Sequence, residues 1–173
     1  ITLLKHYPET LIDKAIDAFY LLENGKKWCA HSLQAVEIET STLCNWKCEY
    51  CPGSFSKREP TFMEESLFSR IIKKIAAYPG IRYVALHLYN EPTIDPRFRE
   101  RVLELTRHNL SLSLATNGEY LNDELIHFLK DIKLFEVIIN FPSIYRDEFI
   151  YITGCKHYEQ VETNIRNALR SGL

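Results

Sequence analysis

The chain has 173 residues, of which 46% are hydrophobic and 25% charged, and its formal net charge is -2. This composition is close to the average of globular domains, so it excludes collagen-like, low-complexity and disordered chains. The charges are spread along the sequence, which favours neither nucleic acid nor an anionic membrane as a partner. No apolar run approaches the ~18 residues of a membrane span, and no leader pattern opens the chain, so we expect a cytoplasmic protein.

Apolar residues at helical spacing predict an amphipathic helix near the start of the chain. They fall within residues 9–24, and Gly25 follows as a helix stop. We therefore expect an N-terminal helical extension over residues 1–34, followed by a core domain over residues 35–173.

The core alternates strand-like and helix-like segments. Strands are predicted at residues 35–40, 82–89, 111–116 and 134–141. Helices are predicted at residues 63–77, 96–109, 122–131 and 157–171, and Thr61 with Glu64 suggests a capping box for the first of them. Such alternation predicts an α/β fold with a parallel sheet and right-handed crossovers. Leu173 stands where a fifth strand would begin, so we expect a chain truncated after about four βα units.

Polar segments follow each predicted strand, at the edge of the sheet where ligands bind in parallel α/β folds. A cysteine-rich loop follows the first strand and Tyr89-Asn90-Glu91-Pro92 ends the second. Thr116-Asn117-Gly118 ends the third strand and Asn140 lies at the end of the fourth. We therefore expect one functional site at this edge.

Five cysteines are an odd number, which argues against a disulfide framework and for a reducing compartment. Cys44, Cys48 and Cys51 are clustered, whereas Cys29 and Cys155 stand alone and are expected to be packing residues. A structural zinc site needs four ligands, and only the distant His31 and His87 are candidates for the fourth. A four-iron four-sulfur cluster held by three cysteines has one iron open to a small molecule.

The spacing Cys-x3-Cys-x2-Cys, with the aromatic Tyr50 before the third cysteine, resembles the signature of the radical S-adenosylmethionine (radical SAM) superfamily. The resemblance extends from about residue 35 to the end of the chain. It implies a partial (β/α) barrel of radical SAM type, with a 4Fe-4S cluster and SAM as cofactors. Cys44, Cys48 and Cys51 would be the metal ligands at the catalytic centre.

The same resemblance implies the cofactor-binding residues. Tyr50 would lie against the adenine, Glu91 would hold the SAM ammonium group, and Asn90 beside it would also bind the cofactor. Thr116, Asn117 and Asn140 would make further SAM contacts. Each also has a structural reading: Asn117-Gly118 is a common turn signal, and Asn140 would be a buried polar group that needs a partner. His87 is either a core residue or directed toward the substrate.

The implied chemistry is reductive cleavage of SAM to a 5′-deoxyadenosyl radical, which then abstracts hydrogen from a substrate. Tyr89-Asn90-Glu91-Pro92 is similar to members with a C-terminal auxiliary-cluster (SPASM or twitch) domain that oxidise a sugar-like or aminocyclitol alcohol. The alternatives are modification of a ribosomally made peptide and, from another class, a non-catalytic Fe-S or zinc-binding module. The expected partners are a small-molecule or peptide substrate and an electron donor such as flavodoxin or ferredoxin.

Overall fold

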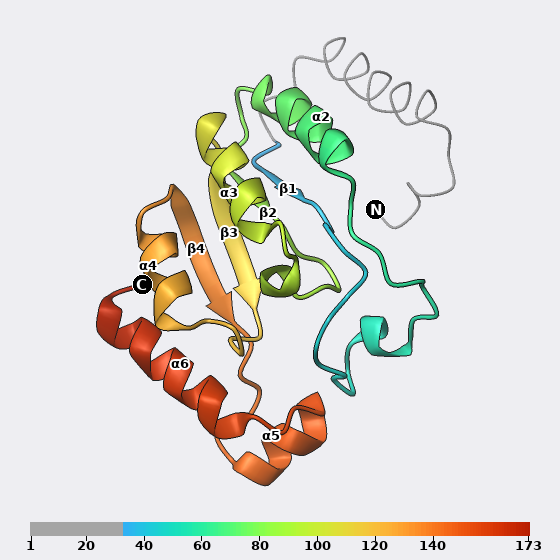
Figure 1. The fold of residues 1–173 in the computed structure, drawn as a ribbon, viewed down its shortest axis with the longest axis vertical. Helices are drawn as coiled ribbons and strands as arrows, with labels where there is room; N and C mark the ends of the chain where they lie inside the picture. Colours follow the sequence, from blue (N-terminus) through green and yellow to red (C-terminus); the bar gives the residue numbers. More distant parts are fainter. Residues whose placement is uncertain (1–32) are drawn as a thin grey trace.

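The computed structural model describes residues 33–173, and the predicted helix at residues 9–24, Cys29 and His31 lie outside them. Four parallel strands form one sheet in the order β1-β2-β3-β4 (Figure 1). The strands are β1 (Ala35–Glu37), β2 (Tyr83–Ala85), β3 (Ser111–Thr116) and β4 (Leu134–Ile139). The predicted α/β fold with sequential parallel strands is confirmed.

Helices connect the strands and extend beyond the sheet. They are α2 (Glu65–Ala76), α3 (Phe98–Arg107), α4 (Asp123–Lys130), α5 (Arg146–Thr153) and α6 (Tyr158–Ser171), with short 3-10 turns η2 (Pro52–Phe55) and η3 (Pro92–Ile94). Four of the five helices lie where the sequence predicts them. No helix of the described part is long and apolar enough to cross a bilayer.

Local predictions differ from the structure at several places. The strands predicted at 35–40 and 82–89 are shorter than expected, at Ala35–Glu37 and Tyr83–Ala85. The capping box is wrong: Glu64 is the N-cap of α2 and makes no side-chain cap bond, because the backbone of Thr61 pairs with Thr42 after β1. Helix α5 was not predicted, since its eight residues include the aromatic and β-branched types that favour strands. Gly154 ends α5 in the left-handed region at φ 67°, which glycine adopts without steric cost.

One face of the sheet packs against α2, α3 and α4 and forms the main core. Val84, Leu112 and Leu114 are fully or almost fully buried there, together with Phe68 of α2 and Leu129 of α4. A second, smaller core lies beyond the carboxyl ends of the strands and consists of residues from the cysteine loop, α5 and α6. Its members are Trp46, Cys48, Phe149, Cys155, Tyr158 and Val161. The second core therefore joins the cysteine loop to the last two helices.

The turn that follows β2 is fixed by a buried ion pair. Arg101 of α3 donates from Nε to Asp95 Oδ2 at 3.0 Å, and both side chains are almost completely buried. Arg101 also donates to the carbonyl of Met63 at 2.6 Å. The pair thus fastens the segment after Glu91 to the start of α2.

The substitution Asp95→Ala should lower the free energy of unfolding by about 3–5 kcal/mol, because it leaves the Arg101 charge buried without its partner. Arg166→Ala is the control, since it breaks an exposed pair with Glu162 and should cost less than about 1 kcal/mol. Urea unfolding followed by circular dichroism measures both. Equal losses would contradict the structural role of the buried pair.

Candidate functional site

Three cysteines lie on the loop between β1 and η2, beyond the ends of the strands. Cys44 is exposed, Cys48 buried and Cys51 partly buried, and all three thiols are free. The backbone N–H of Cys51 donates to the carbonyl of Cys48 at 3.1 Å, which closes the turn between them. Although Cys44 as a residue is exposed, its sulfur is largely surrounded by protein, and this burial raises the pKa of the thiol to about 11; burial also raises the pKa of Cys48. The thiols of Cys44 and Cys48 are therefore protonated at neutral pH until a metal displaces the protons.

The backbone of this loop is fastened to the end of α5. The N–H of Lys47 donates to the carbonyl of Thr153 at 3.1 Å, and the N–H of Glu49 donates to the carbonyl of Ile152 at 2.9 Å. A Cβ on Gly154 would stand 3.4 Å from the carbonyl oxygen of Lys47, so the two segments are in close contact. The conformation of the loop thus depends on a helix about one hundred residues further along the chain.

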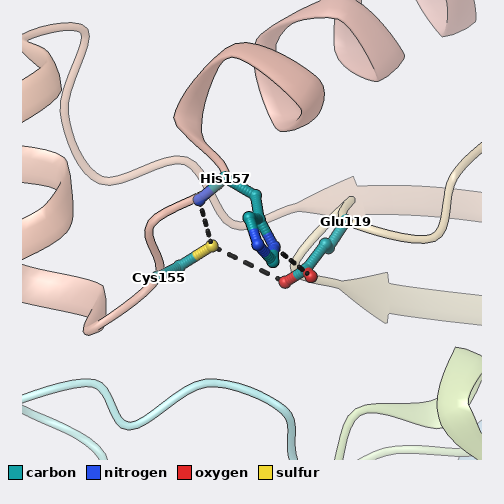
Figure 2. Close-up of side chains that lie close together, drawn as sticks. All are labelled: Glu119, Cys155 and His157. Atoms are coloured by element: carbon teal, nitrogen blue, oxygen red, sulfur yellow. Dashed lines mark hydrogen bonds and ion pairs between the residues drawn. The ribbon is translucent and has the colours of Figure 1, made fainter.

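Glu119 holds the same loop from the turn after β3. Its Oε2 accepts from Trp46 Nε1 at 2.6 Å and from Asn45 Nδ2 at 2.8 Å, while its Oε1 lies 2.8 Å from His157 Nδ1 (Figure 2). Burial would raise the pKa of Glu119, but the hydrogen bonds from His157, Trp46 and Cys155 lower it below its usual range. Sequence analysis missed Glu119. The available signal was a carboxylate directly after the Asn117-Gly118 turn, at the edge where ligands bind.

Glu91, predicted to hold an ammonium group, is buried and bonded within the protein. Its Oε1 accepts from Thr93 and from Thr116 Oγ1, and its Oε2 accepts from the N–H of Asn117 at 2.8 Å. Burial raises the pKa of Glu91, although these hydrogen bonds act in the opposite direction. Glu91 therefore joins the end of β2 to the end of β3.

Asn90, Thr116 and Asn117 also make bonds that shape the strand ends. The Asn90 side chain bonds to the backbone of Leu88 and Leu86 on its own strand end. Asn117 Nδ2 donates to Asn45 Oδ1 at 2.7 Å, which connects the turn to the cysteine loop. The turn interpretation of Asn117-Gly118 is confirmed by φ 79° at the glycine. Contact of these residues with SAM stays a prediction.

Tyr50 and Asn140 meet at the surface of this edge. Asn140 Nδ2 donates to the Tyr50 hydroxyl at 2.6 Å, although the residues are ninety positions apart. Tyr50 is 57% exposed, so its ring is available to a flat ligand. Asn140 is exposed rather than buried, which corrects the expectation of a buried polar group, because β4 has a neighbour on one side only in the described sheet.

The residues present fit a cluster with three protein ligands. Cys48 and Cys51 lie close enough to Cys44 on one loop that, besides the larger effect of burial, their negative charge raises the pKa of the Cys44 thiol. His87, one proposed fourth zinc ligand, instead accepts at Nδ1 from the N–H of Ala115 at 3.2 Å, and this bond joins β2 to β3. Thiolates are the ligands that iron–sulfur clusters prefer, and three of them leave one iron open.

Comparison with known proteins agrees with this geometry. Residues 38–173 match the model of the Radical SAM superfamily. A tungsten-containing aldehyde ferredoxin oxidoreductase cofactor-modifying protein of Pyrococcus furiosus is 30% identical over 95 residues, which are 55% of this chain and 27% of the relative. An S-adenosyl-L-methionine-dependent 2-deoxy-scyllo-inosamine dehydrogenase of Niallia circulans is 24% identical over 108 residues, which are 60% of this chain and 43% of the relative.

The fold also resembles solved structures. The structure of Streptococcus suis SuiB bound to S-adenosylmethionine superposes with a TM-score of 0.70 at 16% identity, over 98% of this chain and 39% of SuiB. At that identity the similarity concerns the fold, which is the partial barrel expected from the sequence. The chain spans less than half the length of these relatives.

Removing the Glu119 carboxylate should loosen the cysteine loop. In Glu119→Ala, Trp46 and Asn45 lose a charged acceptor, so we expect the amides of Lys47 and Glu49 to exchange with solvent roughly tenfold faster or more. Hydrogen–deuterium exchange of the metal-free chain measures this. Glu124→Ala, on the exposed face of α4, is the control and should leave both amides unchanged. Unchanged exchange in Glu119→Ala would show that the α5 contacts suffice.

Proposed function

The chain belongs to the radical SAM superfamily, and we propose that it is the part of an enzyme that holds a 4Fe-4S cluster on Cys44, Cys48 and Cys51. The observation that carries the proposal is the placement of three free thiols on one loop at the carboxyl edge of the sheet. Bonds from Glu119 and α5 hold that loop in the metal-free chain. When bound, such a cluster supplies the electron for cleavage of SAM to a 5′-deoxyadenosyl radical.

The chain's own residues would bind and orient SAM at the same edge. Tyr50 offers an exposed ring for the adenine, and its hydroxyl bond to Asn140 fixes the direction of that ring. The carboxylate of Glu91 adds negative charge at the end of β2, which favours a positively charged amino group nearby. Asn90, Thr116 and Asn117 shape the edge around it through their bonds to the strand ends.

The absence of a side chain at Gly53 lets the cysteine loop pack closely against Tyr89. A Cβ at Gly53 would lie 3.1 Å from the carbonyl oxygen of Tyr89 and 3.4 Å from Cys51 Sγ. The third cysteine and the carbonyl of Tyr89, four residues after the end of β2, are therefore neighbours. This proximity favours a ligand that contacts both the cluster and the strand end, as an amino acid moiety would.

For the substrate, we infer an alcohol on a sugar-like or aminocyclitol ring. The support is the sequence similarity to the inosamine dehydrogenase and the segment Tyr89-Asn90-Glu91-Pro92. The sheet face opposite the main core also carries polar groups, including Ser113 Oγ, which donates to Glu136 Oε1 at 2.9 Å. Polar side chains on that face suit a hydroxylated ring.

We also propose a cytoplasmic location and a small redox protein as the electron donor. The four cysteines of the described part are free thiols, which supports a reducing, cytoplasmic location. A low-potential protein such as flavodoxin or ferredoxin would then supply the electron.

Cleavage of SAM tests the first part of the proposal. The anaerobic chain, reconstituted with iron and sulfide and reduced with dithionite, should contain about four irons and convert SAM into 5′-deoxyadenosine. Cys44→Ala, Cys48→Ala and Cys51→Ala should each abolish product, because the cluster loses a ligand. Cys29→Ala removes a thiol outside the motif and is the matched control. Zinc uptake in place of iron would contradict the proposal. A loaded cluster without product would uphold the cluster ligands and contradict the cleavage of SAM by this chain.

Isotope transfer tests the substrate class. With 2-deoxy-scyllo-inosamine deuterated at its carbinol carbons, hydrogen abstraction should place deuterium in 5′-deoxyadenosine, which mass spectrometry detects. Unlabelled substrate and the Cys51→Ala variant are the controls. Transfer of deuterium from a labelled peptide, and not from the cyclitol, would favour the peptide-modifying alternative.

A further inference from the structure

A second group of metal-binding side chains lies beside the cysteine loop. It consists of Glu119 in the turn after β3 and of Cys155 and His157 in the loop between α5 and α6 (Figure 2). One ligand atom from each residue lies within 4.8 Å of the other two. We propose that these three residues bind a divalent transition-metal ion, best matched by zinc, at a site separate from Cys44, Cys48 and Cys51.

Two distances, each to a different oxygen of Glu119, are close to those around a small tetrahedral ion. Zinc–ligand bonds of ~2.0–2.3 Å place neighbouring ligand atoms roughly 3.3–3.5 Å apart. Cys155 Sγ lies 3.6 Å from Glu119 Oε2, and His157 Nδ1 lies 2.8 Å from Glu119 Oε1. The imidazole has to move away from Oε1 by about half an ångström to fit. The side chain of His157 is 61% exposed, so this movement meets little packing.

The groups around the ligands hold them in place. The backbone N–H of His157 donates to Cys155 Sγ at 3.3 Å, a bond that fixes the direction of the sulfur. Trp46 and Asn45 both donate to Glu119 Oε2, which leaves Oε1 with His157 as its hydrogen-bond partner among the described residues. Bonds of this kind to metal-binding side chains orient them and strengthen metal binding. Glu119 and Cys155 are buried, whereas His157 faces solvent, so an ion has an entry path and a water position.

The hydrogen bond of the Cys155 thiol to Glu119 is too long to explain why the thiol lies beside this carboxylate. The thiol is the third donor to Glu119 Oε2 and lies furthest away, at 3.6 Å, behind two N–H groups at 2.6 and 2.8 Å. A metal ion provides the sulfur with a stronger partner. On binding, the thiol releases its proton to solvent, the neutral imidazole binds through Nδ1 with its proton on Nε2, and Glu119 is already ionised.

Cobalt(II) is the first probe, because its spectrum reports sulfur ligands. The triple variant Cys44→Ala, Cys48→Ala, Cys51→Ala removes the competing thiols, and we expect it to bind one Co²⁺ with a sulfur-to-cobalt charge-transfer band and four-coordinate visible bands. Adding Cys155→Ser should abolish the charge-transfer band, whereas adding Cys29→Ala should leave it. A missing band, or one that persists with Cys155→Ser, overturns the proposal.

Zinc affinity of the cluster-loaded chain gives an independent measurement that needs no change in the cysteine loop. A chelator competition should show one Zn²⁺ per chain, and His157→Asn should weaken it roughly tenfold or more. His127→Asn, on the exposed side of α4, is the matched control. Equal zinc affinity of the unsubstituted chain and His157→Asn overturns the proposal. The cobalt measurement uses a chain without the three loop cysteines, so its outcome is independent of the proposed function, whereas the zinc measurement rests on the proposed loading of the cluster.

Discussion

The arrangement of the site depends on the carboxylate of Glu119, which accepts from Trp46 and Asn45 within the cysteine loop. Two donors on one charged oxygen, the buried Trp46 and the exposed Asn45, are worth more than neutral hydrogen bonds, because a charged acceptor shortens and strengthens them. The loop carries no regular structure of its own between β1 and η2. Its conformation therefore depends on Glu119, which the fold brings to the loop from the turn after β3.

A second carboxylate, that of Glu91, holds together the segments that follow β2 and β3. Glu91 joins β2 to β3 through Thr116 and Asn117, and Asn117 in turn contacts Asn45 of the loop. The two carboxylates are thus linked through a chain of hydrogen bonds that passes across three strand ends. Such networks make the geometry of each member depend on the others, so the cysteines and the strand ends keep a fixed relation.

The sequence predicts the parallel sheet and four of the helices because alternation and periodicity are local signals. The cysteine triplet is also local, and its placement at the carboxyl edge follows from the topology. The contribution of Glu119, the bonds from the end of α5 and the Tyr50 to Asn140 contact were not predictable, since each joins residues separated by about seventy to one hundred positions. Helix α5 was missed because Phe149, Ile150 and Tyr151 favour strands, while packing against Trp46 and Tyr158 decides its conformation.

The division between buried and exposed polar groups explains how one edge can be rigid and still accept ligands. Glu91, Asn117 and Glu119 are buried and bonded within the protein, so their contribution is made before any ligand arrives. Tyr50, Asn140 and His157 are exposed. A loop that protein contacts already order loses less conformational entropy when its thiolates bind metal. The buried carboxylates therefore favour cofactor binding at positions they do not themselves occupy, and the exposed side chains are accessible to the bound group.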